Sequence, residues 1–228
     1  MGVDPFNVER INRVPRARRP YRRGVIREQF LAGARVVVDA VASPAVGSAW
    51  DEPSVLDDQT VGGLAGHLAR GAVWVVGDYL DQPPPAPTFT SAEHYFATLM
   101  TWSDAASNQA IRDRGRAIAA AGQSAVVADA CARLAALEAR LPGEPADRVT
   151  VVAGGAMRLD DYLATRIVEQ VVHLDDLARS VAVGPWPSPD ANVRLAVTVG
   201  AATGLLRFGG PAMVRALFRD DASALPVL

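Results

Sequence analysis

Two residues in the last third of the chain could bind a metal ion together. Glu169 and His173 lie four positions apart in RIVEQVVHLDDLARS, residues 166–180, which has the apolar spacing of an amphipathic helix. Residues four apart lie one above the other on the same helix face, so their side chains are neighbours. The same spacing also suits an ordinary solvated face with weak ion pairs. This helix alone leaves both interpretations open.

A third residue, His67, favours the metal hypothesis. It is one of three histidines in the chain and lies among small and apolar residues in GGLAGHLARGAVW. A buried imidazole without a partner costs about 1–3 kcal/mol, so His67 needs a metal or a hydrogen-bond acceptor such as a backbone carbonyl. Two histidines and a glutamate, with an open position for water or substrate, suit a catalytic divalent metal such as zinc. The glycines that surround His67, and would permit close packing or access, are Gly62, Gly63, Gly66 and Gly71.

The composition and the apolar spacing predict that packed helices position these residues. Half of the 228 residues are hydrophobic and 6% are aromatic, which favours helix packing over a β-sandwich. Helical spacing is interrupted near Trp102, whereas Gly115 and Gly122 are expected to be tolerated within helices. Residues 149–158 are expected to be a short connecting segment. The sequence therefore predicts an all-α bundle with helices over 25–41, 61–81, 92–140, 159–181 and 190–208, and a short helix at the end.

Composition narrows the class of protein. The apolar stretches are too short to span a membrane, and the first residues lack the apolar core of a secretory signal, so we expect a cytoplasmic protein. The single Cys131 is consistent with a reducing compartment, and its neighbours predict a buried small hydrophobe. All 23 basic residues are arginine, which is typical of a GC-rich genome.

The N-terminal residues 1–24 form a basic segment. Within residues 1–28, eight arginines face three acidic residues, a balance of +5, although the whole chain carries a net charge of −2. Such a segment could bind nucleic acid electrostatically. No recognisable nucleic-acid fold follows it, so we expect a disordered extension and no nucleic-acid partner.

Two separated segments together resemble a known family. Trp50 and PSVLDDQTVGGLAGHLARG, followed by YLATRIVEQVVHLDDLARS, are similar to the mycothiol-dependent maleylpyruvate isomerase family of the DinB-like superfamily. The resemblance covers about residues 25–183 and implies a four-helix bundle that holds a divalent metal. The implied ligands are His67 on the second helix, and Glu169 and His173 on the fourth.

The resemblance also implies an activity. The expected protein is a thiol transferase or isomerase that uses a low-molecular-weight thiol, mycothiol, on a small electrophile, in an actinobacterial host. The isomerase has a further α/β domain with a catalytic arginine, whereas only a helical extension, 184–228, follows here, so the substrate stays open. A metal-dependent hydrolase and a non-catalytic metal-binding or regulatory module are the alternatives. A homodimer is compatible with all three.

Four other residues have predicted roles. Arg166 and Asp176 are candidates for orienting Glu169 and His173, and Arg166 could alternatively hold a substrate carboxylate. His94 is expected at the surface or as a capping residue rather than as a ligand. Trp74, seven residues after His67, could line the metal pocket or pack in the core.

Overall fold

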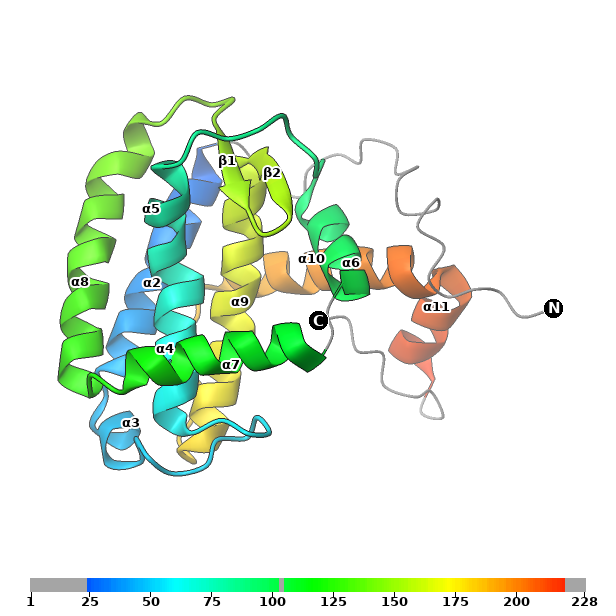
Figure 1. Cartoon of the computed structure of the whole chain (residues 1–228). Helices are drawn as coiled ribbons and strands as arrows, with labels where there is room; N and C mark the ends of the chain where they lie inside the picture. The colour runs from blue at the N-terminus through cyan, green and yellow to red at the C-terminus, as the bar shows by residue number, and fades with distance from the viewer. Residues whose placement is uncertain (1–23, 103–104, 220–228) are drawn as a thin grey trace.

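Four helical segments form a four-helix bundle in the computed structural model, which describes residues 24–102 and 105–219. They are α2 (Val25–Val41), the continuous run α4–η1–α5 (Val61–Ala69, Arg70–Trp74 and Val75–Leu80), α8 (Gln123–Arg140) and α9 (Leu159–Ser180). In Figure 1, α2 and α9 run in one direction and α4–α5 and α8 in the other. The predicted all-α bundle with additional C-terminal helices is confirmed.

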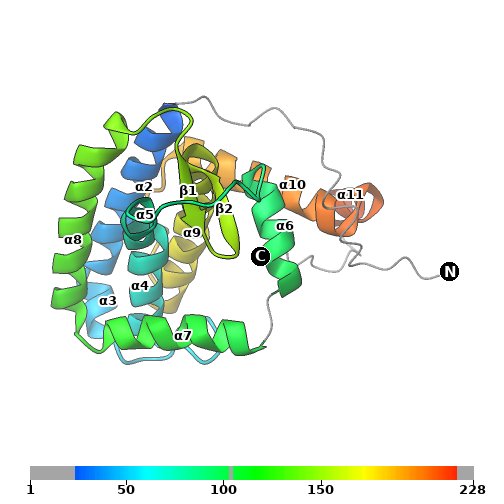
Figure 2. The ribbon, with the colours of Figure 1, turned by 45° about the horizontal axis from the view of Figure 1, so that its top comes forward.

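The remaining helices cover the ends and one side of the bundle. α3 (Pro44–Ser48) and the 3₁₀ turn η2 (Leu141–Gly143) are short, and α6 (Ala92–Trp102) packs on α10 (Asp190–Phe208), which leads into α11 (Gly210–Phe218). α7 (Ala105–Ala119) lies across the front of α4 and α9 in Figure 1 and packs on α4, and in the tilted view of Figure 2 it still runs crosswise to the bundle.

The region predicted as one helical pattern over 92–140 is three helices. The predicted interruption near Trp102 coincides with the end of α6. The expectation that Gly122 is tolerated inside a helix is wrong, because this residue has a φ of +81° and separates α7 from α8. A positive φ is readily adopted by glycine and is costly for other residues, so this glycine permits α7 to turn across the bundle.

Residues 149–158 form an antiparallel hairpin, where the sequence predicted only a connecting segment. β1 (Val149–Val152) pairs with β2 (Gly155–Arg158) in the register Val149–Arg158 to Val152–Gly155. The backbone N–H groups of Thr88 and Phe89 both donate to the carbonyl of Ala156, at 2.9 and 3.1 Å. The hairpin thus joins the proline-rich loop after α5 to the start of α9.

The core lies between the four bundle segments. Most of its largest fully buried side chains come from α2, α4 and α9, among them Phe30, Leu64, Leu68, Tyr162, Leu163 and Ile167. At one end, the guanidinium of Arg27 on α2 donates to Asp160 at 3.0 Å and to the carbonyl of Leu141 at 2.9 Å. This buried ion pair ties the start of α9 to the first helix.

Helices α4 and α7 approach each other through glycines. A Cβ atom on Gly115 would lie 2.5 Å from the carbonyl oxygen of Gly63, and one on Gly66 would lie 2.7 Å from the carbonyl oxygen of Gly115. Both contacts are with backbone, which cannot move aside as a flexible side chain can. The glycines near His67 therefore serve close packing, as one of the two sequence interpretations proposed.

Substituting Gly115 with Ala should lower the free energy of unfolding by about 1–3 kcal/mol, the usual cost of overpacking. Gly77→Ala is the matched control, because its Cβ would meet only Leu137 Cδ2 at an ordinary 3.9 Å. That change should be neutral or slightly stabilising, since Ala is the better helix former. Urea unfolding of both variants makes the comparison, and equal stabilities would show that α4 and α7 are not locked by this contact.

Three other sequence predictions concern Cys131, the N-terminal segment and membrane-spanning helices. Cys131 is exposed on α8, so its predicted burial is wrong: its helix face turns away from the core positions Val126, Ala130 and Leu134. The predicted basic extension, 1–24, lies outside the described residues except for Gly24. Within the described ranges, no helix is both long enough and apolar enough to cross a membrane.

Candidate metal centre

The three predicted ligands meet at one point between α4 and α9. His67 Nε2 lies 3.7 Å from Glu169 Oε2, and His173 Nε2 lies 3.5 Å from the same oxygen. One ligand atom from each residue can be chosen so that all three lie within 4.8 Å of one another. The two imidazole rings meet edge to face with centroids 4.9 Å apart. Each side chain is 20% exposed, so the cluster is sheltered but remains open on one side.

A π-helical turn directly follows His67. Residues Arg70–Trp74 form η1, an insertion between α4 and α5 of a kind that often marks functional sites. A Cβ on Gly71, inside this turn, would lie 3.8 Å from His67 Cε1, so the turn packs against the imidazole. The π turn therefore helps to place the His67 ring, and the sequence pattern gave no sign of it.

Arg166 joins the π turn to the candidate ligands. Its guanidinium donates to the carbonyl of Gly71 and to Thr165 Oγ1, both at 3.0 Å, and lies 3.8 Å from Glu169 Oε1. Its guanidinium carbon also lies 4.9 Å from the centre of the Tyr162 ring. With these contacts and 7% exposure, Arg166 is placed to hold Glu169 in position, which favours that role over binding a substrate carboxylate.

The charge balance of the cluster keeps Glu169 ionised. Burial opposes ionisation, but Arg166 and the nearby imidazoles of the two histidines outweigh it and hold the pKa of this carboxyl well below its ordinary value. A carboxylate is the form that binds a metal ion.

Asp176 fixes the orientation of His173. The two residues are joined by a 3.0 Å hydrogen bond in which His173 Nδ1 donates to Asp176 Oδ2. Nε2 is then the nitrogen that faces Glu169 and the cluster, an arrangement common in metal-binding histidines. Burial lowers the pKa of His173, but Asp176 and Glu169 reverse this effect and raise it to about 9.

The raised pKa predicts a pH-dependent metal affinity. In the metal-free protein His173 carries a proton on Nε2 below about pH 9, and a metal ion must displace it. Affinity should rise roughly tenfold per pH unit between pH 7 and 9 and then level off, and zinc should release about one proton from this residue at pH 8. Proton release measured in a pH-stat tests this, with Asp176→Asn shifting the transition to lower pH. A flat affinity profile across this range would contradict it.

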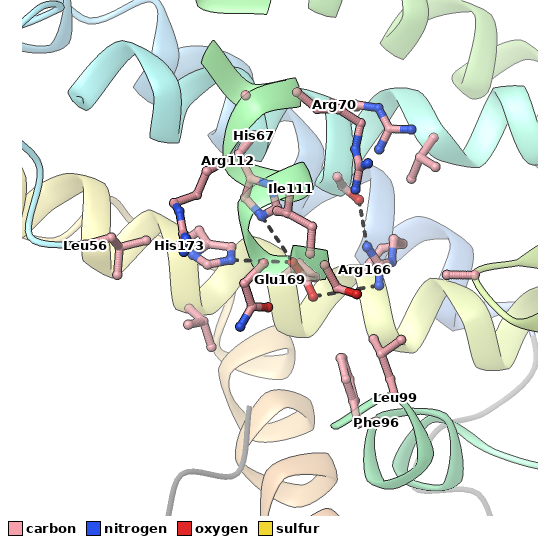
Figure 3. A pocket seen from close by; sticks show the side chains of 18 of the residues that line it. Leu56, His67, Arg70, Phe96, Leu99, Ile111, Arg112, Arg166, Glu169 and His173 are labelled. Atoms are coloured by element: carbon pink, nitrogen blue, oxygen red, sulfur yellow. Dashed lines mark hydrogen bonds and ion pairs between the residues drawn. The ribbon is translucent and has the colours of Figure 1, made fainter. Parts of the chain in front are cut away.

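The cluster lies in a pocket of about 710 Å³ bounded by α4, η1, α6, α7 and α9. Figure 3 shows Phe96 and Leu99 reaching in from α6, and Ile111 and Arg112 from α7. The connection before α4 contributes Leu56, and its backbone is tied to α9 by a 3.0 Å hydrogen bond from the Val55 N–H to Ser180 Oγ. The sequence identified the three residues of the cluster but missed the residues of α6 and α7, which no metal-ligand spacing could indicate.

The other sequence candidates lie outside the cluster. His94 lies near the start of α6, where its Nδ1 accepts the N–H of Thr90 at 3.3 Å. It is 8% exposed, so of the two predicted placements, at the surface or as a capping residue, the surface one is wrong. Trp74 is buried in the core with Arg133 over its ring at 5.0 Å. It does not line the pocket, which settles its two alternatives in favour of core packing.

Comparison with protein families gives a match that covers this site. Residues 30–178 match the model of the mycothiol maleylpyruvate isomerase N-terminal domain. That range contains all three candidate ligands, Arg166 and Asp176. Comparisons with curated proteins and with solved structures gave no match.

Proposed function

The chain belongs to the mycothiol maleylpyruvate isomerase N-terminal domain family, and from this premise we propose that it is a metal-dependent thiol transferase or isomerase. It uses a low-molecular-weight thiol, mycothiol, and acts on a small electrophile. The observation that carries the proposal is the cluster of His67, Glu169 and His173 at the base of a pocket large enough for small molecules.

The residues present fit a divalent metal. Two imidazole nitrogens and one carboxylate, all within 4.8 Å of one another, form a donor set that suits zinc and leaves a position for an exogenous ligand. When bound, the metal would supply a Lewis acid that favours the thiolate form of a coordinated thiol near neutral pH. The thiolate is the nucleophilic form of a thiol.

The chain's own side chains prepare the site for this chemistry. Arg166 keeps Glu169 ionised and oriented, and Asp176 directs His173 Nε2 toward the cluster. Phe96 and Leu99 line the adjacent wall and exclude water from part of the pocket, which strengthens electrostatic interactions within it. We place this activity in the cytoplasm, where thiols are kept reduced.

Thiol dependence of turnover tests the proposed function. Zinc-loaded protein should accelerate conjugation of mycothiol to monobromobimane, and Glu169→Ala should remove the acceleration while Arg35→Ala, at a surface ion pair on the far side of the bundle, leaves it unchanged. Turnover of ester or amide substrates without thiol would instead support a hydrolase. A protein that binds zinc but has no turnover and no exchangeable water on the metal would support the non-catalytic module.

A further inference from the structure

We propose that the pocket beside the cluster binds an amphipathic anion, a small molecule with an extended apolar body and a carboxylate or similar oxyanion head. This proposal rests on the proposed function, which places the reaction at the metal cluster. It adds the chemical class of the substrate that the same pocket would bind. It comes from the walls of the pocket rather than from the metal ligands.

One wall of the pocket is apolar over several elements. α5 contributes Val75 and Tyr79, and α6 contributes Tyr95, Phe96 and Leu99. The rim continues this surface with Leu56, Ile111 and Val172, of which Ile111 and Val172 are each 36% exposed. Exposed apolar side chains that continue a buried apolar wall favour a ligand that extends from the interior to the mouth.

The polar lining of the pocket is dominated by cations. Arg70 and Arg112 both line it, together with the exposed Arg114. Arg70 has no hydrogen bond or ion pair within the described part of the chain, and the buried Nε of Arg112 has no hydrogen-bond partner, although its Nη2 donates to Gln109 Oε1 at 2.8 Å. An unpaired buried donor is costly, and an oxyanion from a ligand would satisfy it.

The acidic groups of the pocket do not offset these arginines. Glu169 is already paired with Arg166, and a divalent metal would add further positive charge. Asp57 is exposed at the rim. Figure 3 shows Arg70 on the opposite side of the Glu169–Arg166 pair from Phe96 and Leu99, so the Arg70 side of the lining is separate from the apolar wall of α6. A ligand with a charged end and an apolar body matches this division.

Alkanesulfonates are suitable probes, because the sulfonate keeps the negative charge and coordinates zinc poorly. Calorimetric titration of the zinc-loaded full chain should show affinity rising from butane- to hexane- to octanesulfonate, by roughly three- to fourfold per buried methylene. Neutral 1-octanol should bind about tenfold or more weakly than octanesulfonate, since it cannot form charge-assisted hydrogen bonds with the arginines.

Single substitutions in the pocket distinguish binding of the charged head from binding of the apolar body. Arg112→Gln and Arg70→Gln should weaken octanesulfonate about tenfold and leave 1-octanol unchanged, whereas Leu99→Gln and Ile111→Gln should weaken both. Arg215→Gln and Leu217→Gln on α11 are the controls, because both residues are exposed and far from the pocket lining. They should change neither affinity.

Three results would overturn the proposal. They are the absence of binding at millimolar octanesulfonate, affinity that is independent of chain length or charge, and an equal loss of binding in the α11 controls. Folding of each variant is checked by circular dichroism and by its bound zinc, which should match the wild type. Wild-type protein without zinc or without thiol-dependent turnover would defeat the proposed function and leave these affinity ratios unaffected, so the two failures are distinguishable.

Discussion

Replacing Glu169 with Ala should abolish stoichiometric zinc binding, and His67→Ala should have the same effect although it lies 102 positions earlier in the sequence. All three ligand atoms lie around one point, and each substitution leaves two donors where a stable site needs at least three protein ligands. The expected loss of affinity exceeds about a hundredfold, the upper limit usual for residues that only orient a ligand. His173→Ala should match both. Bound zinc per chain, measured after identical expression without a metal-affinity step, provides the comparison.

Substitutions of Asp176 and Arg179 provide an intermediate case and a control for the ligand variants. Asp176→Ala should weaken zinc binding by about ten- to a hundredfold, because it releases His173 Nδ1 but keeps every ligand. Arg179→Ala should have no effect on affinity, since this side chain is 63% exposed and reaches Asp176 only at 3.8 Å. If zinc content is unchanged in all the ligand variants and each alters stability by no more than about 0.5 kcal/mol, the residues are only a polar helix face. Wild-type protein that takes up no zinc would contradict the metal-site hypothesis, and the cluster would then have only a structural role.

Glu169 and His173 could be predicted as a pair because their relative position is fixed within one helix. Residues 169 and 173 are four apart, so any helix over this segment puts them side by side. His67 required a second step, since only the packing of α4 against α9 brings it to them. The resemblance supplied that step, and the structure agrees in placing His67 Nε2 next to Glu169.

Other features could not be predicted because they depend on contacts distant in sequence. The carbonyl of Gly71 in the π turn accepts a hydrogen bond from Arg166, and that of Ala72 accepts one from Gln170, so partners on α9 satisfy this turn. No local pattern in RGAVW indicates such an insertion. The orientation of α7 likewise follows from the glycine contacts at Gly115 and Gly63 and the break at Gly122. The contribution of Ile111, Arg112 and Arg114 to the pocket lining is a product of that same crossing.

Substituting Arg166 with Met should destabilise the metal-free protein by about 3 kcal/mol. Met keeps much of the apolar stem, but the change leaves the Glu169 carboxylate without its cationic partner and the Gly71 carbonyl without its donor. Removing one partner of a buried pair usually costs about 3–5 kcal/mol, and the 20% exposure of Glu169 and its contacts with the histidines place this case at the lower end. Urea unfolding with excess chelator measures the effect.

A second substitution identifies the cause of that loss. If the uncompensated charge dominates, adding Glu169→Gln to Arg166→Met should recover at least about 1 kcal/mol, because the neutral amide no longer needs the arginine. Arg35→Met is the control, since its pair with Glu138 is exposed and should contribute less than about 1 kcal/mol. An Arg166→Met variant no less stable than Arg35→Met would mean that Glu169 does not depend on Arg166. The arginine would then be free to bind a substrate carboxylate, and its loss should reduce substrate affinity while the zinc content stays at the wild-type level.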